Sequence, residues 1–314
     1  MRAFEVLHPG IHTTVQDLGR PGFMKYGIPA SGFADRFSAG VANLLVGNAP
    51  GAALLEITLF RLELLALEDL AIAVTGGNLS PMLNGNPLPL WQTVFVWPGD
   101  RIGFRARKQG FRSYLAVQGG FPGPRFLGSR SVFTRGLMGS MLKTGEVLEA
   151  ESTGAKLASP KSLASDMIPP SPSDDPLRVV PGPQEDRFTR KGIETFLSSE
   201  YRVSPQSDRM GYRLQGPPVE HAKGADIISE PIPRGAIQVP GDGLPILLLW
   251  DAQVSGGYTK IGSVISADLD RLAQIMPGES LRFRAVALEE AHESLRKERA
   301  GFERARRFLE EQNG

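Results

Sequence analysis

The same short landmarks occur twice in this sequence, in the same order. Gln16 precedes Arg20-Pro21-Gly22-Phe23 in the first half, and Gln206 precedes Arg209-Met210-Gly211-Tyr212 in the second. Further matched pairs follow in register: Pro-Gly-Asp at 98–100 and 240–242, Gly-Gly-aromatic at 119–121 and 256–258, and Gly-Glu-X-Leu at 145–148 and 278–281. Ordered internal repeats indicate duplication of one structural unit. The sequence therefore predicts two related domains.

Composition and landmarks together suggest the domain boundaries. We expect a first β domain at residues 1–150, with a helical insertion near residues 30–70, and a second β domain at residues 177–287. Residues 151–176 are rich in Ser, Pro and Asp, which is typical of a linker or an exposed loop. Residues 288–314 place an apolar residue at every seventh position and predict a C-terminal helix. Its narrow apolar stripe suits packing on its own domain or docking onto another subunit.

Short β-branched or aromatic segments bounded by Gly or Pro predict a fold that is mainly β with a few helices. So many short strands favour closed barrels or strongly curved sheets. The expected strands are Ala71–Thr75, Thr93–Trp97, Ser113–Gln118, Leu177–Val180, Ala236–Val239, Pro245–Gln253 and Ser280–Val286. The expected helices are Phe37–Val46, Asp186–Ser198 with Asp186 as its N-cap, and Ala267–Met276.

Bulk composition excludes several classes of function. The 314 residues carry a net charge of +1 with no basic stripe, so nucleic acid is not an expected partner. The chain contains no cysteine, which excludes disulfides, zinc thiolates and a cysteine nucleophile. The start of the chain has no basic flank followed by an apolar run, and no apolar stretch is long enough to span a membrane. The cytoplasm is the expected location.

Familiar cofactor and catalytic motifs are missing. There is no GxxxxGK[ST] loop, and Gly256-Gly-Tyr-Thr-Lys260 lacks its spacing. There is also no GxGxxG or GxSxG motif. Pro9-Gly10 separates His8 from His12, so this pair does not have helical metal-binding geometry, and no metal site is expected. Met24-Lys25-Tyr26 is a poor match to a biotin-carrier turn, so no biotin is expected on this chain.

Polar residues gather in the second half. In a strand at Pro245–Gln253, Leu247, Leu249, Asp251 and Gln253 share one face, which places Asp251 and Gln253 at the open end of a core. Asp251 could equally cap the following turn.

The segment from Gln206 to Arg209 also contains Ser207. The planar guanidinium of Arg209 is suited to binding a carboxylate or a phosphate. An exposed loop with a surface Asp–Arg pair is the alternative. Gln16 and Arg20 repeat its Gln and Arg in the first half.

Glu230 and Asp242 add acids that could act as a base or hold a metal, although Asp242 also suits a turn. We expect one cleft to be lined by Gln206, Ser207, Arg209, Glu230, Asp242 and Gln253.

Long motifs resemble one family. Gly10-Ile-His-Thr-Thr-Val-Gln-Asp-Leu-Gly-Arg20 is similar to the opening of the KipA family, also called allophanate hydrolase subunit 2-like or biotin-dependent carboxyltransferase-like. The segments 27–35, 42–48, 55–56, 114–120, 127–130, 181–184, 204–214, 228–230, 235–243 and 251–257 fit the same family. Thr259 stands where the family usually has proline, and Phe33-Ala34 replaces a usual small-residue–Met pair.

The resemblance implies two cyclophilin-like β-barrel domains and a role as the C subunit of an ATP-dependent 5-oxoprolinase, which hydrolyses 5-oxo-L-proline to L-glutamate. The implied partners are a KipI-like B subunit and a LamB/YcsF-like A subunit, and the implied co-substrate is ATP with Mg²⁺ in the complex.

Under this hypothesis the catalytic candidates are Asp242, Asp251 and Glu230, and the substrate- or phosphate-binding candidates are Gln16, Arg20, Gln206, Ser207, Arg209, Gln253 and Lys260. The alternatives are a carboxyltransferase component that uses carboxybiotin and a urea-like substrate, and a non-enzymatic antagonist of a KipI-type kinase inhibitor.

Overall fold

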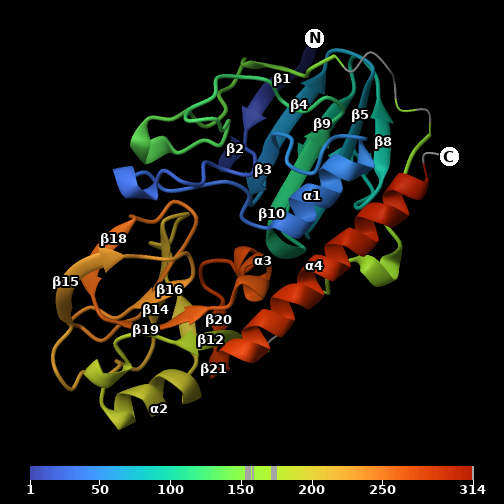
Figure 1. Ribbon diagram of the computed structural model, residues 1–314. Coiled ribbons are helices and arrows are strands. Elements are labelled where there is room, and N and C mark those ends of the chain that lie inside the picture. The colour runs from blue at the N-terminus through green and yellow to red at the C-terminus, as the bar shows by residue number, and fades with distance from the viewer. Residues whose placement is uncertain (153–156, 158, 171–174, 313–314) are drawn as a thin grey trace. The chain divides into compact units, whose positions relative to one another are not determined.

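The computed structural model describes residues 1–152, 157, 159–170 and 175–312 and divides the chain into two compact units (Figure 1). The first unit contains Met1–Arg20, Ser31–Ser171 and Ala300–Gly314, and the second contains Pro21–Ala30 and Pro172–Arg299. Pro21–Ala30 therefore groups with the second unit, and the C-terminal helix contributes residues to both. Part of the expected linker, at residues 153–156, 158 and 171–174, lies outside the described residues.

Two antiparallel sheets build the first unit. The six-stranded sheet has the order β11 (Val147–Glu149), β1 (Arg2–Pro9), β4 (Leu62–Ala66), β9 (Arg101–Phe104), β6 (Pro81–Leu83), β7 (Asn86–Pro87). The five-stranded sheet has the order β2 (His12–Gln16), β3 (Leu54–Thr58), β10 (Gln109–Val117), β5 (Leu70–Asn78), β8 (Thr93–Val96).

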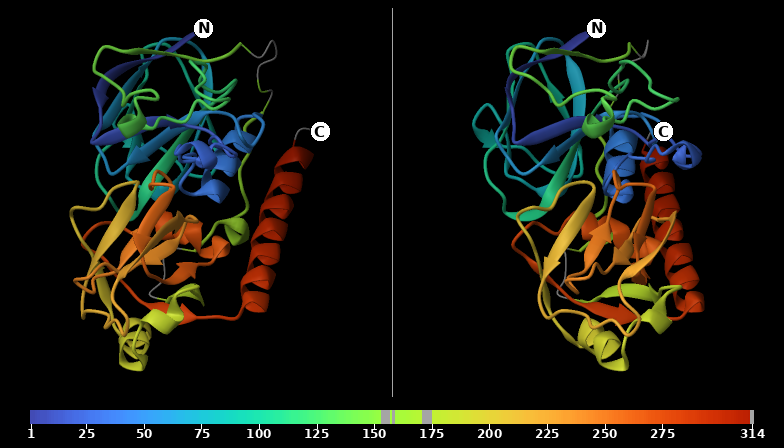
Figure 2. Two further views of the ribbon diagram at one scale, coloured as in Figure 1. Left: turned by 60° about the vertical axis from the view of Figure 1, so that its left-hand side comes forward. Right: turned by 90° about the vertical axis from the view of Figure 1, so that its left-hand side faces the viewer.

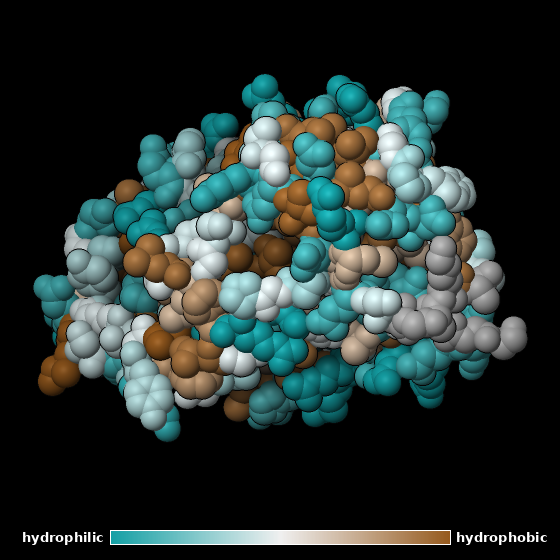
Figure 3. Space-filling view, turned by 90° about the horizontal axis from the view of Figure 1, so that it is seen from above, coloured by the Kyte–Doolittle hydropathy of each residue, from teal (hydrophilic) through white to brown (hydrophobic). Residues whose placement is uncertain are grey.

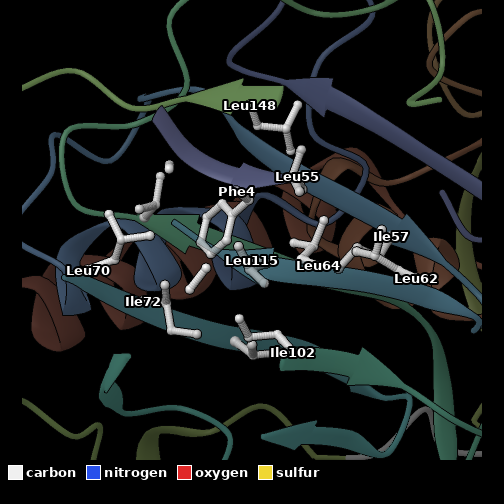
Figure 4. Close-up of a cluster of buried hydrophobic side chains, with 14 of the residues drawn as sticks. Phe4, Leu55, Ile57, Leu62, Leu64, Leu70, Ile72, Ile102, Leu115 and Leu148 are labelled. Carbon is white, nitrogen blue, oxygen red and sulfur yellow. The ribbon is translucent and has the colours of Figure 1, made fainter. Parts of the chain in front are cut away.

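A single apolar core fills the space between these sheets (Figure 4). Side chains alternate across a strand, so every second residue of β4 and β9 points inward, and the same holds for β3, β5 and β10. The fully buried members include Phe4, Leu55, Leu64, Ile72, Ile102 and Leu115.

The other face of the five-stranded sheet is also buried. α1 (Arg36–Leu45) contacts β5 and β10 (Figure 2), and Asp35 caps α1 by accepting a hydrogen bond from the Ser38 N–H at 2.9 Å. Leu45 and the last turns of α4 (Leu288–Glu311) pack with Tyr114 in a second cluster. The expected insertion at residues 30–70 thus contains α1, but it also supplies β3 and β4.

The second unit contains an eight-stranded sheet with the order β20 (Ser280–Leu281), β13 (Tyr201–Val203), β14 (Gly211–Gln215), β17 (Ile246–Leu248), β16 (Ala236–Gln238), β19 (Lys260–Val264), β12 (Leu177–Pro181), β21 (Phe283–Ala285). The pair of β12 and β21 is parallel. A separate two-stranded sheet joins β15 (Asp226–Pro231) to β18 (Ser255–Tyr258). The helices are α2 (Arg190–Ser198) and α3 (Leu269–Ala273), besides the first turns of α4.

Several predicted elements need correction. Asp186 does not cap a helix: it lies in the 3₁₀ turn Glu185–Arg187, and α2 begins at Arg190 because Thr189 accepts from the Gly192 N–H at 2.9 Å. The nine-residue strand expected at Pro245–Gln253 is only β17, since the chain turns at Trp250 and Asp251. The strand expected at Ser280–Val286 is split between β20 and β21, and the helix at Ala267–Met276 shortens to α3.

At the level of class, the expectation of a mainly β protein with a few helices is confirmed, with antiparallel sheets in both units. The relation of the two units by duplication and their cyclophilin-like character stay predictions.

None of the helices in the described ranges is both long and apolar enough to span a membrane. Seen from above, hydrophobic residues form separate groups between hydrophilic ones (Figure 3).

Candidate functional site

Glu230, Lys260 and Gln184 form a polar cluster in the second unit. The Lys260 ammonium donates to Glu230 Oε1, and the Gln184 amide donates to the same oxygen at 2.7 Å. The side-chain Oε1 of Gln184 in turn accepts from the Lys260 backbone N–H at 3.2 Å. Gln184 therefore ties the loop after β12 to both β15 and β19.

The cluster presents a charged carboxylate to solvent. The Lys260 side chain is only 5% exposed, whereas that of Glu230 is 37% exposed. Hydrogen bonds from Lys260 and then Gln184 favour the ionised form and hold the pKa of Glu230 below its ordinary value. Within the described chain no donor contacts Glu230 Oε2, so this oxygen is open to a ligand.

Strand pairing explains how distant residues meet here. Glu230 in β15 lies opposite Gly256 in β18, and Lys260 in β19 lies opposite Gln238 in β16. Gly182, between β12 and Gln184, approaches β19 so closely that a Cβ atom would lie 2.1 Å from the Lys260 carbonyl oxygen. A side chain at this position cannot be accommodated without moving the backbone.

Replacing Gly182 by alanine is therefore expected to destabilise the second unit by about 1–3 kcal/mol, because the added methyl group displaces β19. Urea unfolding followed by circular dichroism measures the effect. Gly241→Ala is the matched control: no atom lies within 4 Å of its Cβ position, so stability should stay within about 0.5 kcal/mol. Equal effects of both substitutions would contradict the close approach.

A second pair lies deeper in this unit. Arg209 Nε donates to Asp251 Oδ2 at 2.8 Å and Nη2 donates to Oδ1 at 3.4 Å, with side chains 8% and 9% exposed. The Asp251 N–H also donates to the Arg209 carbonyl oxygen at 3.0 Å, which fixes the turn after β17 against the loop before β14. One edge of the guanidinium is thus engaged by Asp251.

The other predicted residues of this unit lie in loops. Gln206 is exposed and accepts from the Ser204 hydroxyl, while Ser207 Oγ accepts from the Arg213 N–H at 3.1 Å. Asp242 is exposed and accepts from the Leu244 N–H at 3.0 Å, as a turn-forming aspartate does. Gln253 is exposed. The structure brings together Glu230 with Lys260 and Arg209 with Asp251, and the common cleft stays a prediction.

Gln16 and Arg20 belong to the first unit and are almost fully buried. The Gln16 amide donates to the Val132 carbonyl oxygen at 3.1 Å, and Arg20 donates to the carbonyl oxygens of Phe126 and Ser131. Their observed contacts therefore hold the segment from Phe126 to Val132.

Sequence reasoning missed two polar residues in these networks. Gln184 links Glu230 to Lys260, and Asp17 accepts from the Ser129 hydroxyl, the Arg130 N–H and the Ser131 hydroxyl at 2.5, 2.7 and 2.7 Å. Both residues lie inside the motifs that carry the family resemblance. This location is the signal in the sequence that could have identified them. Across the described residues, no group of three or more His, Cys, Asp or Glu could hold a metal ion.

Comparison with known proteins agrees with this architecture. Residues 26–285 match the family described as "Carboxyltransferase domain, subdomain A and B". The chain is 35% identical to the C subunit of 5-oxoprolinase from Haemophilus influenzae, over 98% of this chain and 99% of that protein, with the same figures for the Escherichia coli protein.

Urea amidolyase of Saccharomyces cerevisiae is 32% identical over 91% of this chain, which corresponds to only 17% of that protein. The crystal structure of the K. lactis urea amidolyase superposes with a TM-score of 0.90 at 32% identity, over 96% of this chain and 20% of that one. The chain therefore belongs to the family of the carboxyltransferase domain, subdomains A and B, and is a homologue of the 5-oxoprolinase C subunit.

Proposed function

We propose that the chain acts as the C subunit of an ATP-dependent 5-oxoprolinase, which hydrolyses 5-oxo-L-proline to L-glutamate together with a KipI-like B subunit and a LamB/YcsF-like A subunit. The observation that carries this proposal is the 35% identity to the 5-oxoprolinase C subunit over 99% of that protein. ATP, with Mg²⁺, is the proposed co-substrate of the complex.

The chemistry accounts for the consumption of ATP. The five-membered lactam is unstrained and its amide resists attack by water. Transfer of the γ-phosphoryl group of ATP to the amide oxygen releases ADP and makes that oxygen a leaving group. Water then adds to the ring carbon and the C–N bond breaks, which frees the amine and leaves an acyl phosphate. A second water releases phosphate and leaves glutamate, so that one ATP and two waters are consumed for each lactam opened.

Within this reaction we assign Glu230 to substrate recognition. Its Oε2 is open, its carboxylate is kept ionised, and a lactam offers one N–H to such an acceptor. A group with a lowered pKa is a weak proton acceptor at neutral pH, so Glu230 is better suited to hold the ring N–H than to act as a general base. Lys260, nearly buried, positions Glu230.

The predicted roles of the remaining candidates depend on whether their side chains are buried or exposed. Asp251, engaged by Arg209, supports the loops around the site. Asp242, Gln206 and Gln253 are exposed and remain the candidates for contacts with substrate, phosphate or another protein of the complex.

The family description and the TM-score of 0.90 to a urea amidolyase favour a second candidate. In it, the chain transfers CO₂ from carboxybiotin on another protein to a urea-like molecule. Glu230 would accept an N–H of urea in the same way, so the cluster fits both substrates.

Co-expression with the KipI-like and LamB/YcsF-like proteins separates these candidates. We expect the chain to co-purify with the KipI-like protein, the complex to form glutamate from ATP and 5-oxoproline, and the isolated chain to be inactive. The isolated chain is inactive on this account because it contains no complete phosphate-binding or nucleophile motif. Biotin-dependent carboxylation of urea, with no turnover of 5-oxoproline, would favour the second candidate. Full turnover by the isolated chain would contradict the requirement for partners.

A further inference from the structure

The first unit contains a cavity of about 330 Å³ that the proposed reaction does not use. Its apolar walls come from β2, the loop after β10 and the segment that leads into β11, and include Val15, Phe121, Phe126, Val132 and Leu142. Its cationic group is Arg130, and Glu146 and Glu149 lie at its exposed rim. A cavity of this size accommodates a small organic molecule.

Three polar residues, Gln16, Asp17 and Arg20, hold one wall of this cavity in place. Phe126, Arg130 and Val132 line this wall, and the backbone of each forms a hydrogen bond with one of these polar side chains. Arg20 donates to Phe126 O, Asp17 accepts from the Arg130 N–H at 2.7 Å, and Gln16 donates to Val132 O at 3.1 Å. Such a rigid wall lowers the entropic cost of binding a ligand.

One hydrogen-bond donor of the Arg130 guanidinium has no acceptor among the described residues. Its side chain is 19% exposed, and Nη2 donates to Glu151 Oε1 at 2.9 Å. Its Nε–H is buried and meets no hydrogen-bond acceptor among the described residues. Buried polar groups without partners are uncommon, and the Nε–Nη2 edge of arginine matches the two oxygens of a carboxylate.

We propose that this cavity binds a small molecule with an apolar body and a single carboxylate, which replaces Glu151 on the Nε–Nη2 edge of Arg130. Glu151, whose side chain is 53% exposed, occupies Nη2 in the free protein and moves aside for the ligand. Glu146 and Glu149 at the rim repel molecules that carry several negative charges, so the site selects against nucleotides. The proposal is independent of the reaction assigned to the second unit.

The test uses the full-length chain and ¹⁹F NMR of two probes, 4-fluorobenzoate and 4-fluorobenzyl alcohol, which share a ring and differ in charge. We expect the benzoate resonance to broaden on addition of protein and the alcohol to bind about 10-fold more weakly or worse. Arg130→Met should weaken benzoate binding by about 10-fold or more, whereas Arg125→Met, an exposed arginine outside the cavity, should leave it unchanged.

A further variant keeps the test decisive if Arg130→Met does not fold. Arg130→Lys retains the charge but removes the Nε edge, so it should also weaken benzoate binding while preserving the circular dichroism spectrum. Equal binding of the two probes would overturn the proposal. Unchanged binding in both Arg130 variants, or an equal loss in Arg125→Met, would overturn it as well.

Discussion

Replacing Asp251 by asparagine is expected to lower the free energy of unfolding of the second unit by about 3–5 kcal/mol. The substitution keeps the size of the side chain but removes the negative charge that pairs with the buried Arg209 guanidinium. Urea unfolding, followed by circular dichroism and by the fluorescence of the adjacent, buried Trp250, measures the change.

Asp242→Asn is the matched control for this prediction. Asp242 is exposed, and asparagine retains the oxygen that accepts from the Leu244 N–H, so the loss should stay below about 0.5 kcal/mol. A similar small loss in Asp251→Asn would show that the pair with Arg209 is not important for stability.

Glu230→Gln is expected to lower kcat/KM of the assembled complex for 5-oxoproline by about 100-fold. The neutral amide is a weaker acceptor for the lactam N–H, and its NH₂ group can point toward the substrate. Lysine and glutamine neighbours hold the pKa of Glu230 below its usual 4.5, so the carboxylate remains charged at lower pH than in the unfolded chain. Its contribution should therefore persist from pH 8 to pH 5 and disappear only as the pH falls through the lowered pKa.

Steady-state rates across this pH range test the assignment, with Glu194→Gln as a control. Glu194 is an exposed carboxylate of α2 paired with Arg190, so its replacement should leave the rate unchanged. If Glu230→Gln retained full activity, or if the wild-type rate fell with an apparent pKa near neutrality that Glu230→Gln abolished, the recognition role would be wrong.

The fold class followed from the sequence because it depends on local features. Short β-branched segments between glycine and proline predicted β strands, and the seven-residue apolar spacing predicted the C-terminal helix, which the structure has at Leu288–Glu311. Element ends were less predictable, because tertiary contacts set them. Thr189 rather than Asp186 caps α2, and the turn at Trp250–Asp251 ends β17 early.

The candidate site was only partly predictable for the same reason. Residue type identified Glu230, Lys260, Arg209 and Asp251 as chemically capable, but sequence spacing does not show which partners they meet. The pairs form between segments far apart in the chain. The family motifs do not distinguish an arginine that binds backbone oxygens, such as Arg20, from one that lines a cavity, such as Arg130.

The most direct test of the proposed function is the rate of glutamate formation by the three purified proteins of the complex, with and without this chain. The account predicts glutamate and ADP in equal amounts from 5-oxoproline and ATP when all three are present. It predicts loss of that activity when this chain is omitted. An unchanged rate without the chain, or glutamate formation that needs no ATP, would contradict the account.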